Sequence, residues 1–241
     1  MRAESPKMFA GSSNGRTPPF GGGYLGSNPG PAAMDGKNKN AVEIYDLIAE
    51  DYAKKFDPIE SDEDLRFLNF FLSHLKPKST ILDIGCGTGF SAGYFNENGM
   101  AVEGVDLSKN MIAIAKRNYP NIKFTIGDLR EFSPQKPVNA VWAGYSLFHF
   151  EQTSLEKTLE RIKTYLLPNG IFGLAMQEGV GEIELNEPFL PKKKIYIHLY
   201  TKEELVKILE KHGFEVINQD LKKTAEYEFP YNKILIIARL K

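Results

Sequence analysis

The segment Asp83-Ile84-Gly85-Cys86-Gly87-Thr88-Gly89 has the residue types and spacing of a ligand-binding turn. It follows the apolar run 80–84 and precedes a helical stretch from Phe90 to Asn98. This order of strand, glycine turn and helix lets a ligand press against the backbone and directs helix N-terminal N–H groups at it. An acidic side chain at Asp83 would repel a phosphate, so the turn favours a ligand that carries a positive charge.

Two other kinds of glycine loop fit this segment poorly. A dinucleotide site uses G-x-G-x-x-G, and with Gly85 and Gly87 as the first glycines the third would fall at Phe90. A nucleoside triphosphate loop needs Lys-Ser or Lys-Thr after its last glycine, and neither follows Gly89. An NAD-dependent oxidoreductase therefore stays a weaker alternative.

Further candidate binding residues follow the next apolar runs. Asp106 ends the second run about 20 residues after the turn, where a carboxylate can accept both hydroxyls of a ribose. Asp128 follows the third run, and the fourth run, 139–144, ends in small residues beside Tyr145. Taken singly, Asp106 could instead cap a helix and Asp128 could belong to a simple turn.

Taken together, these segments resemble the class I S-adenosylmethionine-dependent methyltransferases. L-D-I-G-C-G-T-G is similar to their first motif, and the resemblance extends from Tyr45 to the C-terminus. It implies S-adenosyl-L-methionine as cofactor, with Asp83 facing the methionine amine, Asp106 the ribose and Asp128 the adenine. The implied cofactor-binding residues are Tyr45, Tyr52, Asp83, Gly85, Cys86, Gly87, Asp106, Leu107, Met111, Asp128, Leu129 and Ala143.

A leading helix completes the resemblance. Tyr45, Ile48, Tyr52 and then Phe56 recur at helical spacing, as in small-molecule methyltransferases whose first helix lies over the cofactor. The same aromatic side chains could instead pack this helix onto the core. We interpret Cys86 as a small space-filling residue and not as a nucleophile.

His149 is the candidate catalytic base, because it follows the fourth strand at the cofactor end of the sheet. His74 and His212 lie near predicted helix ends, and we interpret both as structural. A dedicated base is not required when the reaction is an in-line displacement with a good leaving group, since positioning and exclusion of water carry much of the catalysis.

Substrate-binding residues are expected in two places. Tyr145 lies at the end of the fourth strand. The run 195–200 alternates, with aliphatic residues on one face and Tyr196, His198 and Tyr200 on the other. In related enzymes the insertion after the fifth strand folds over the acceptor, so these three side chains are predicted to line its pocket; a solvated strand face is the alternative.

Alternating apolar runs and amphipathic stretches predict an α/β fold. The resemblance implies a Rossmann-like, seven-stranded, mainly parallel sheet of order 3-2-1-4-5-7-6, with strand 7 antiparallel and helices on both faces. Strands are predicted near 80–84, 101–105, 122–126, 139–144, 170–176, 214–218 and 232–239. Helix-end signals are predicted at Ser61, Pro77, Gly99, Ser108, the capping boxes 153–156 and 201–204, and Gly213.

The N-terminal region, 1–38, is rich in Gly, Pro, Ser and Asn and has no hydrophobic period. Such a segment cannot offset the entropy of ordering, so we predict a disordered leader, or an artefact of cloning upstream of Met34. The methyltransferase domain is predicted to span 39–241. A chain started at Met34 is expected to be equally soluble and active.

The charge balance, the single cysteine and the lengths of the apolar stretches limit the kinds of partner and location that we expect. Thirty basic and thirty-one acidic residues give no net field for a polyanion, which argues against nucleic acid. A single cysteine forms no internal disulfide and no structural zinc site, so we predict no metal and a reducing, cytoplasmic location. No apolar stretch approaches the roughly 18 residues of a membrane helix. We expect a monomer or homodimer.

The predicted function is methyl transfer to a small-molecule acceptor. An RNA or protein acceptor is the first alternative. Methylation of an adenine amine is disfavoured, because Ala143-Gly144-Tyr145-Ser146 stands where the enzymes of that kind carry [DNS]-P-P-[YFW]. A regulatory protein that binds S-adenosylmethionine without transferring the methyl group is the second. The acceptor atom lies beyond what the sequence shows, because fold analogy supplies no substrate.

Overall fold

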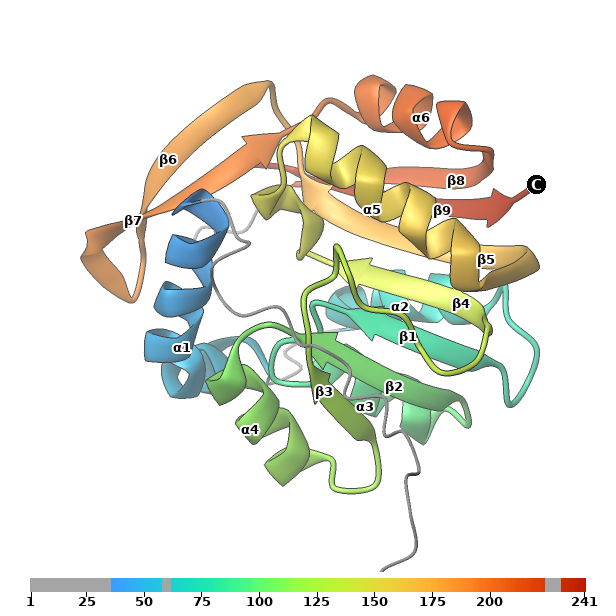
Figure 1. Cartoon of the computed structure of the whole chain (residues 1–241), viewed down its shortest axis with the longest axis horizontal. Helices are drawn as coiled ribbons and strands as arrows, with labels where there is room; N and C mark the ends of the chain where they lie inside the picture. The colour runs from blue at the N-terminus through green and yellow to red at the C-terminus, as the bar shows by residue number, and fades with distance from the viewer. Residues whose placement is uncertain (1–35, 58–61, 224–230) are drawn as a thin grey trace, which may run out of the picture.

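The computed structural model describes residues 36–57, 62–223 and 231–241, which form an α/β fold around one large sheet (Figure 1). Within these residues the large sheet has seven strands in the order β3-β2-β1-β4-β5-β9-β8. Its strands are β1 (Thr80–Ile84), β2 (Ala101–Asp106), β3 (Lys123–Ile126), β4 (Val138–Gly144), β5 (Leu166–Gln177), β8 (Phe214–Lys222) and β9 (Lys233–Leu240). The pairs of β9 with β5 and with β8 are antiparallel and the other strand pairs of this sheet are parallel, so the predicted strand order and the antiparallel seventh strand are confirmed.

Helices pack on both faces of this sheet (Figure 1). They are α1 (Gly36–Phe56), α2 (Asp62–Leu72), α3 (Phe90–Glu97), α4 (Lys109–Asn118), α5 (Gln152–Tyr165) and α6 (Lys202–Lys211), with the short 3-10 helix η2 (Leu147–His149) after β4. Alternate side chains of the strands separate the two layers: Leu82 packs in a cluster with α5 and α6, and Ile81 in a cluster with α2 and α3. Successive side chains of a strand point to opposite faces, and both faces are covered by helices, so the central strands are apolar on both faces.

A second sheet stands at the edge of the first. It is the hairpin of β6 (Gly181–Glu187) and β7 (Leu190–Leu199), which lies beside α1 in Figure 1. Ala41, Ile44 and Ile48 of α1 are buried against Ile195 of β7. On another side of the same helix, Ala49 packs with Met111 and Ile114 of α4. Helix α1 therefore bridges the hairpin and the main domain.

Several predicted helix ends are present. Ser108 caps α4 by accepting a hydrogen bond from the Met111 N–H at 3.2 Å. Thr201 and Glu204 form a reciprocal capping box at the start of α6. Gly99 and Gly213 follow α3 and α6 with φ of 82° each, in the left-handed region that favours glycine.

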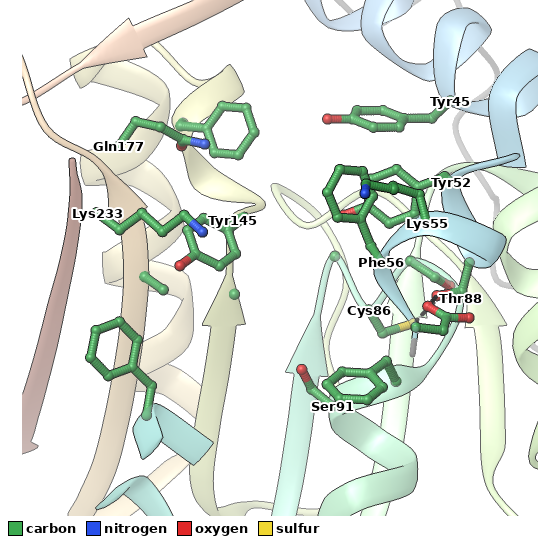
Figure 2. A pocket seen from close by; sticks show the side chains of 18 of the residues that line it. Tyr45, Tyr52, Lys55, Phe56, Cys86, Thr88, Ser91, Tyr145, Gln177 and Lys233 are labelled. Atoms are coloured by element: carbon green, nitrogen blue, oxygen red, sulfur yellow. Dashed lines mark hydrogen bonds between the residues drawn. The ribbon is translucent and has the colours of Figure 1, made fainter. Parts of the chain in front are cut away.

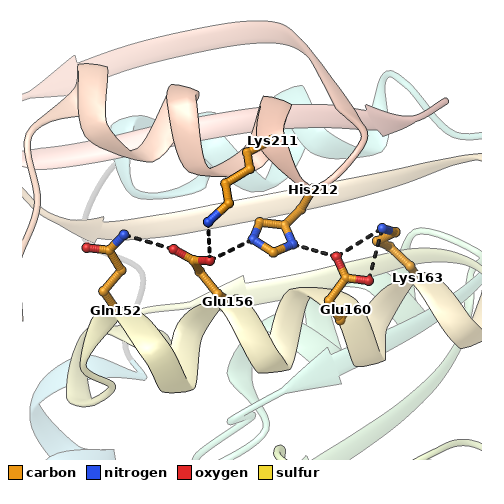
Figure 3. A network of polar contacts seen from close by, with 6 residues as sticks. All are labelled: Gln152, Glu156, Glu160, Lys163, Lys211 and His212. Atoms are coloured by element: carbon orange, nitrogen blue, oxygen red, sulfur yellow. Dashed lines mark hydrogen bonds and ion pairs between the residues drawn. The ribbon is translucent and has the colours of Figure 1, made fainter.

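The capping box predicted at 153–156 is wrong. Helix α5 begins at Gln152, and Glu151 stands at its N-cap without a side-chain capping bond. Glu156 instead joins a polar network between α5 and α6 (Figure 3), where its carboxylate accepts from Gln152, Lys211 and His212. Lys211 and His212 lie 55 and 56 residues later in the chain, at the end of α6, so no local pattern revealed these two partners.

Other boundaries differ more modestly. Helix α1 begins at Gly36, inside the segment predicted as leader, and Asn38 is buried. Helix α2 ends at Leu72, before the predicted stop at Pro77. Strand β8 continues to Lys222, four residues beyond the predicted end at 218. Ser61, Met34 and the rest of 1–35 lie outside the described residues.

Candidate functional site

The turn after β1 adopts a conformation that its glycines permit. Gly85, Gly87 and Gly89 have φ of 67°, 52° and 86°. A Cβ on Gly85 would lie 2.2 Å from Cβ of Ser146, so this position has no room for a side chain. A Cβ on Gly87 would meet nothing within 4 Å, because Gly87 borders open space. The turn thus exposes backbone to a ligand at Gly87.

Asp106 holds this turn to the end of β2. One carboxylate oxygen accepts from the Gly87 N–H at 2.9 Å, and the other accepts from the Ser108 N–H at 2.8 Å. Burial raises the pKa of Asp106, while these N–H donors oppose that shift. Each carboxylate oxygen has a second lone pair, so the group can still accept hydroxyl hydrogens from a ligand.

Asp83 lies beneath the turn, with only 2% of its surface exposed. Its Oδ2 atom has no hydrogen-bond partner among the described residues. Burial, and then the charge of Asp106, raise the pKa of Asp83 to about 8. A hydrogen bond from the Ala92 backbone opposes that shift, but the unpaired Oδ2 is costly to bury, and a nearby cation would lower that cost.

A cavity of about 130 Å³ opens over Asp106, and we call it the Asp106 cavity. Its lining combines the ends of β2 and β3 with α1 and the segment after β4. Predicted cofactor-binding residues found there are Tyr45, Tyr52, Gly85, Gly87, Asp106, Leu107, Met111, Asp128 and Leu129. His149 and Tyr145 line the same cavity.

The carboxylate of Asp128 already has a partner. Both of its oxygens accept from the Arg130 guanidinium, from Nε at 2.9 Å and from Nη2 at 2.5 Å. This ion pair and the backbone N–H of Arg130 lower the pKa of Asp128 against the opposing effect of burial. Asp128 therefore presents to a ligand as a charged acceptor fixed in position by Arg130.

A second cavity, of about 300 Å³, adjoins the first, and we call it the Gln177 cavity (Figure 2). In Figure 2, Gln177, Lys233 and Tyr145 face Tyr45, Tyr52, Lys55 and Phe56 across an open gap. Much of its remaining lining is aromatic. Residues common to both cavities are Tyr45, Tyr52, Gly85, Gly87, Gly144 and Tyr145, so the two form one continuous cleft.

Helix α1 is anchored as a roof over this cleft. Asp46 accepts from the Ser108 hydroxyl at 2.6 Å, which ties α1 to the start of α4. Asp57 accepts from the Thr88 hydroxyl at 2.6 Å, which ties the end of α1 to the glycine turn. These two attachments hold Tyr45 and Tyr52 over the turn.

His149 is buried between α1 and the hairpin. Its Nδ1 lies 2.9 Å from the Tyr196 carbonyl oxygen, which only accepts, so Nδ1 carries the proton. Nε2 is then the acceptor, and the Tyr45 hydroxyl donates to it at 3.1 Å. Burial lowers the pKa of His149 to about 4, which keeps the imidazole neutral near pH 7.

The part of the chain that contains the glycine turn is similar to known proteins. Residues 81–170 match the family model of a methyltransferase domain. A dTDP-3-amino-3,6-dideoxy-alpha-D-glucopyranose N,N-dimethyltransferase from Streptomyces fradiae is 33% identical over 133 residues, which are 54% of this chain and 50% of that protein. A demethylmenaquinone methyltransferase from Chlorobaculum tepidum is 30% identical over 171 residues, covering 67% of this chain and 65% of that protein.

A solved structure shows the same fold. The chain superposes on an S-adenosylmethionine-dependent methyltransferase from Methanosarcina mazei with a TM-score of 0.65 and 18% identity, covering 71% of this chain and 96% of that one. The chain matches a methyltransferase domain over residues 81–170 and shares the fold of that solved methyltransferase. It spans between half and two thirds of the length of the two curated relatives above. No helix in the described part is both long and apolar enough to cross a membrane.

Three predicted cofactor-binding residues do not line the Asp106 cavity. Ala143 is fully buried and lines neither cavity, while the next residue, Gly144, lines both. Asp83 is also absent from both linings. Cys86 lines the Gln177 cavity, and burial raises its thiol pKa well above the usual value, which makes it a poor nucleophile.

Tyr196, His198 and Tyr200 line neither cavity among the described residues. The Tyr200 hydroxyl donates to the Phe150 carbonyl at 3.3 Å, and its ring stacks on His198. The expectation fails because α1 covers the aliphatic face of β7, so that Ile195 faces the cleft. The opposite face is not solvated either, since Tyr196 and Tyr200 are only 5% and 2% exposed.

Several residues of the cleft were missed from the sequence. Gln177 and Lys233 end β5 and begin β9, and Phe189 comes from the turn of the hairpin. None belongs to a transferable motif. The signal that could have located the first two is the register of β5 and β9, which the predicted antiparallel direction of the last strand does not fix by itself.

Tyr145 occupies the junction of the two cavities in a backbone conformation unusual for a bulky residue, with φ of 56°. Its N–H donates to the Ala175 carbonyl at 2.9 Å, and the Lys233 ammonium lies 5.4 Å from its ring centroid. Such strain persists where surrounding structure fixes it and is frequent at ligand sites.

Proposed function

We propose that this chain binds S-adenosyl-L-methionine along the glycine turn, in the Asp106 cavity and the adjoining junction with the Gln177 cavity, and methylates a small organic acceptor held in the rest of the Gln177 cavity. The observation that carries the proposal is the continuity of the two cavities at Gly85, Gly87 and Gly144, under Tyr45 and beside Tyr145. A cofactor and an acceptor placed on the two sides of that junction would meet there. The relatives are named as amino-sugar and demethylmenaquinone methyltransferases, which supports an acceptor of small-molecule size.

The residues present fit the cofactor. It carries an ammonium and a sulfonium, and Asp83 offers a buried carboxyl whose Oδ2 has no hydrogen-bond partner in the described chain. Gly87 leaves open space where any side chain would intrude. Asp106 would accept the ribose hydroxyls, and the backbone around Asp128 and Leu129 would border the adenine.

When bound, the cofactor supplies a methyl group on a positively charged sulfur, which is a good leaving group. The chain's contribution is then to position the acceptor and exclude water. Helix α1 does both, because Asp46 and Asp57 fix it over the cleft and its Tyr45 and Tyr52 close the junction from above. Misplacing α1 should therefore slow transfer more than it weakens cofactor binding.

His149 and Tyr45 would handle a proton from an acceptor hydroxyl or amine. The Tyr45 hydroxyl donates to the neutral His149 Nε2, so the lone pairs on the Tyr45 oxygen remain available to a group in the cleft. A proton taken by Tyr45 would pass on to Nε2. His149 acts here through Tyr45, and Nδ1 stays bonded to the Tyr196 carbonyl throughout.

Calorimetric titration with S-adenosylhomocysteine, the product, tests the proposal directly. NAD and ATP are the control ligands. Asp106→Ala should weaken binding by at least tenfold, because two hydrogen bonds to a charged acceptor are lost. The matched control Asp51→Ala removes an exposed carboxylate from α1 and should leave the affinity unchanged.

Failure to bind S-adenosylhomocysteine, or a preference for NAD, would overturn the cofactor assignment. Binding without methyl transfer to any acceptor in a broad screen would favour the regulatory alternative instead. Transfer to an RNA or protein substrate, with none to small molecules, would overturn the acceptor class.

A further inference from the structure

Two buried polar atoms in the wall of the Gln177 cavity have no hydrogen-bond partner among the described residues. They are Nε1 of Trp142 and Oε1 of Gln177, and both residues line this cavity. Trp142 is 3% exposed and Gln177 is 7% exposed. A buried donor or acceptor without a partner costs free energy, so native proteins retain few of them. Two such atoms in the wall of one ligand-sized cavity indicate that a ligand supplies their partners.

The indole ring of Trp142 lies across two glycines of the central strands. A Cβ on Gly173 would lie 2.5 Å from its Cε3 atom, and a Cβ on Gly144 would lie 2.7 Å from Nε1. The rings of Phe71 and Phe95 pack against the indole and hold it in place. Because Gly144 lines both cavities, the Trp142 N–H lies next to the junction where cofactor and acceptor would meet. An indole N–H only donates, so the partner it lacks is an acceptor atom.

Gln177 stands on the same face of the sheet as Trp142. Gly144 of β4 is the register partner of Ala175 of β5, and side chains two residues apart on a strand share a face. All four residues line the cavity, and the two small ones leave room for a ligand between the indole and the amide. In Figure 2 the Gln177 amide is directed at the open gap. Its Oε1 accepts and cannot donate, so the partner it lacks is an O–H or N–H group.

The charged side chains of the cavity already have partners. Asp57 accepts from a threonine hydroxyl at 2.6 Å, and Glu187 accepts from two backbone N–H groups at the hairpin turn at 2.7 and 2.8 Å. Lys55, Lys222 and Lys233 each take part in an interaction of their own. Both unpartnered atoms belong to uncharged side chains, so an uncharged ligand satisfies them without bringing a further charge out of water.

The rest of the cavity is suited to a flat apolar body. Its lining includes the rings of Phe56, Phe67, Phe90, Phe148 and Phe189. Rings of this kind pack on aromatic ligands in offset-stacked or edge-to-face contacts. A volume of about 300 Å³ is at the small end of ligand cavities and suits a body of one or two rings.

We propose, building on the function proposed above, that Trp142 and Gln177 select an uncharged aromatic methyl acceptor. Its O–H or N–H group donates to Gln177 Oε1, and an oxygen atom of the acceptor accepts from Trp142 Nε1. The ring body lies among the phenylalanine rings of the cavity. Since Nε1 lies beside Gly144, the oxygen bonded to it stands next to the junction of the two cavities.

Magnetic resonance of the indole tests the Trp142 contact directly. Trp142 is the only tryptophan of the chain, so isotope-labelled protein gives one indole N–H signal. The full chain, with S-adenosylhomocysteine in excess, is titrated with 2-quinolone, with 2-naphthol and with naphthalene. The first carries an N–H and a carbonyl oxygen, the second a hydroxyl and the third neither. We expect 2-quinolone or 2-naphthol to move the indole proton downfield, as a new hydrogen bond does, and naphthalene not to. The ligand that moves it further distinguishes an N–H acceptor from an O–H acceptor.

Gln177→Met tests the second contact, because it keeps the length of the side chain and removes the amide. In the wild type the better of the two polar ligands should bind about tenfold more tightly than naphthalene, and Gln177→Met should abolish that preference. The same variant should raise the Tm of the ligand-free protein by roughly 2 °C or more, since a buried atom without a partner is replaced by an apolar group. Gln219→Met, an exposed position of β8 outside both cavities, should change neither quantity.

Three results would each overturn the inference. They are equal affinity for polar and apolar ligands, a polar preference that survives Gln177→Met, and a Tm that falls in this variant, which would show that the amide is needed by the fold itself. Any of them with normal S-adenosylhomocysteine binding leaves the proposed methyltransferase intact. A polar preference in a protein that does not bind S-adenosylhomocysteine refutes the proposed function alone.

Discussion

The Nε2 atom of His149 accepts a hydrogen bond from the Tyr45 hydroxyl at 3.1 Å, and this bond joins η2 to α1 across the cleft. Because Nδ1 donates to the Tyr196 carbonyl on β7, the imidazole touches all three elements that close the site. A charged imidazole carries a proton on both nitrogens, so its Nε2 could no longer accept a hydrogen bond from the Tyr45 hydroxyl. The resting arrangement, before any proton is taken up, therefore requires a neutral His149.

This requirement predicts how stability changes with pH. The folded pKa of His149, about 4, is below its unfolded value of about 6.5, so its contribution is full above pH 6.5 and is lost as pH falls toward 4. Between pH 7.5 and 5 the loss is about 2 kcal/mol. Urea unfolding at both pH values should show this difference in the wild type and not in His149→Asn. An equal pH dependence in the two proteins would contradict the assignment.

Tyr45→Phe separates proton handling from packing. The ring remains, so the edge-on contacts with Tyr52 and His149 persist, but the hydroxyl between His149 and the cleft is lost. We expect S-adenosylhomocysteine affinity to change less than threefold and kcat for a hydroxyl acceptor to fall by about a hundredfold. Tyr94→Phe, which removes a hydroxyl bonded to Asn69 on the surface, is the control. An unchanged kcat would exclude the relay.

Asp83 predicts proton release on cofactor binding. In the free protein its pKa is about 8, so the carboxyl is largely protonated at pH 7. A bound ammonium or sulfonium would favour the charged form and lower that pKa. Titrations at pH 7 in buffers of different ionisation enthalpy should reveal release approaching one proton, and affinity should rise with pH up to about 8. Asp83→Asn should abolish the release; persistence of the release in this variant would assign it to another group.

Gly87 and Gly99 form a matched pair for testing the turn. Both have positive φ, 52° and 82°, and a Cβ on either would meet nothing within 4 Å. Alanine at either position should therefore cost about 1 kcal/mol of backbone strain. Only Gly87 borders the two cavities, so Gly87→Ala should also weaken S-adenosylhomocysteine binding by at least tenfold. Equal affinities for the two variants would remove Gly87 from the site.

The sequence predicted the sheet well because its signals are local. A strand such as β1 is an apolar run bounded by a turn, and the residues from Asp83 to Gly89 show the chemistry of that turn without tertiary information. The seven strands were placed close to their observed bounds, and the resemblance supplied their order.

The acceptor side was not predictable in the same way. Which face of β7 lines the cleft depends on where α1 packs, and both faces of the run 195–200 are largely buried. Gln177 lies far from Lys222 and Lys233 in the sequence, and the three come together only through the register of three strands. The register between strands that are far apart in the sequence sets these contacts, and the spacing of residues along the chain does not indicate that register.

The network around Glu156 (Figure 3) should contribute to stability and not to the site. Glu156 accepts from Lys211 at 2.6 Å and from His212 at 3.1 Å, and the hydrogen bonds from Lys211, Gln152 and His212 lower its pKa to about 2. Because the folded pKa lies below the unfolded one, the stabilisation is full above about pH 4.5 and is lost as pH falls toward 2. The Glu156 side chain is 20% exposed and its partner Lys211 is 64% exposed, so the ion pair is screened by solvent and is worth about 1 kcal/mol or less.

Glu156→Gln should therefore lower the free energy of unfolding by up to about 1 kcal/mol at pH 7, and the difference from the wild type should shrink below pH 4.5. Glu210→Gln makes the same change at an exposed position of α6 and should alter stability by less than about 0.5 kcal/mol. S-adenosylhomocysteine affinity should stay constant in both variants, since neither residue lines the Asp106 or Gln177 cavity. Urea titrations from pH 3.5 to 7 give the free energy of unfolding, and calorimetry at pH 7 gives the S-adenosylhomocysteine affinity. A change in that affinity for Glu156→Gln would show that the contact between α5 and α6 is coupled to the cleft.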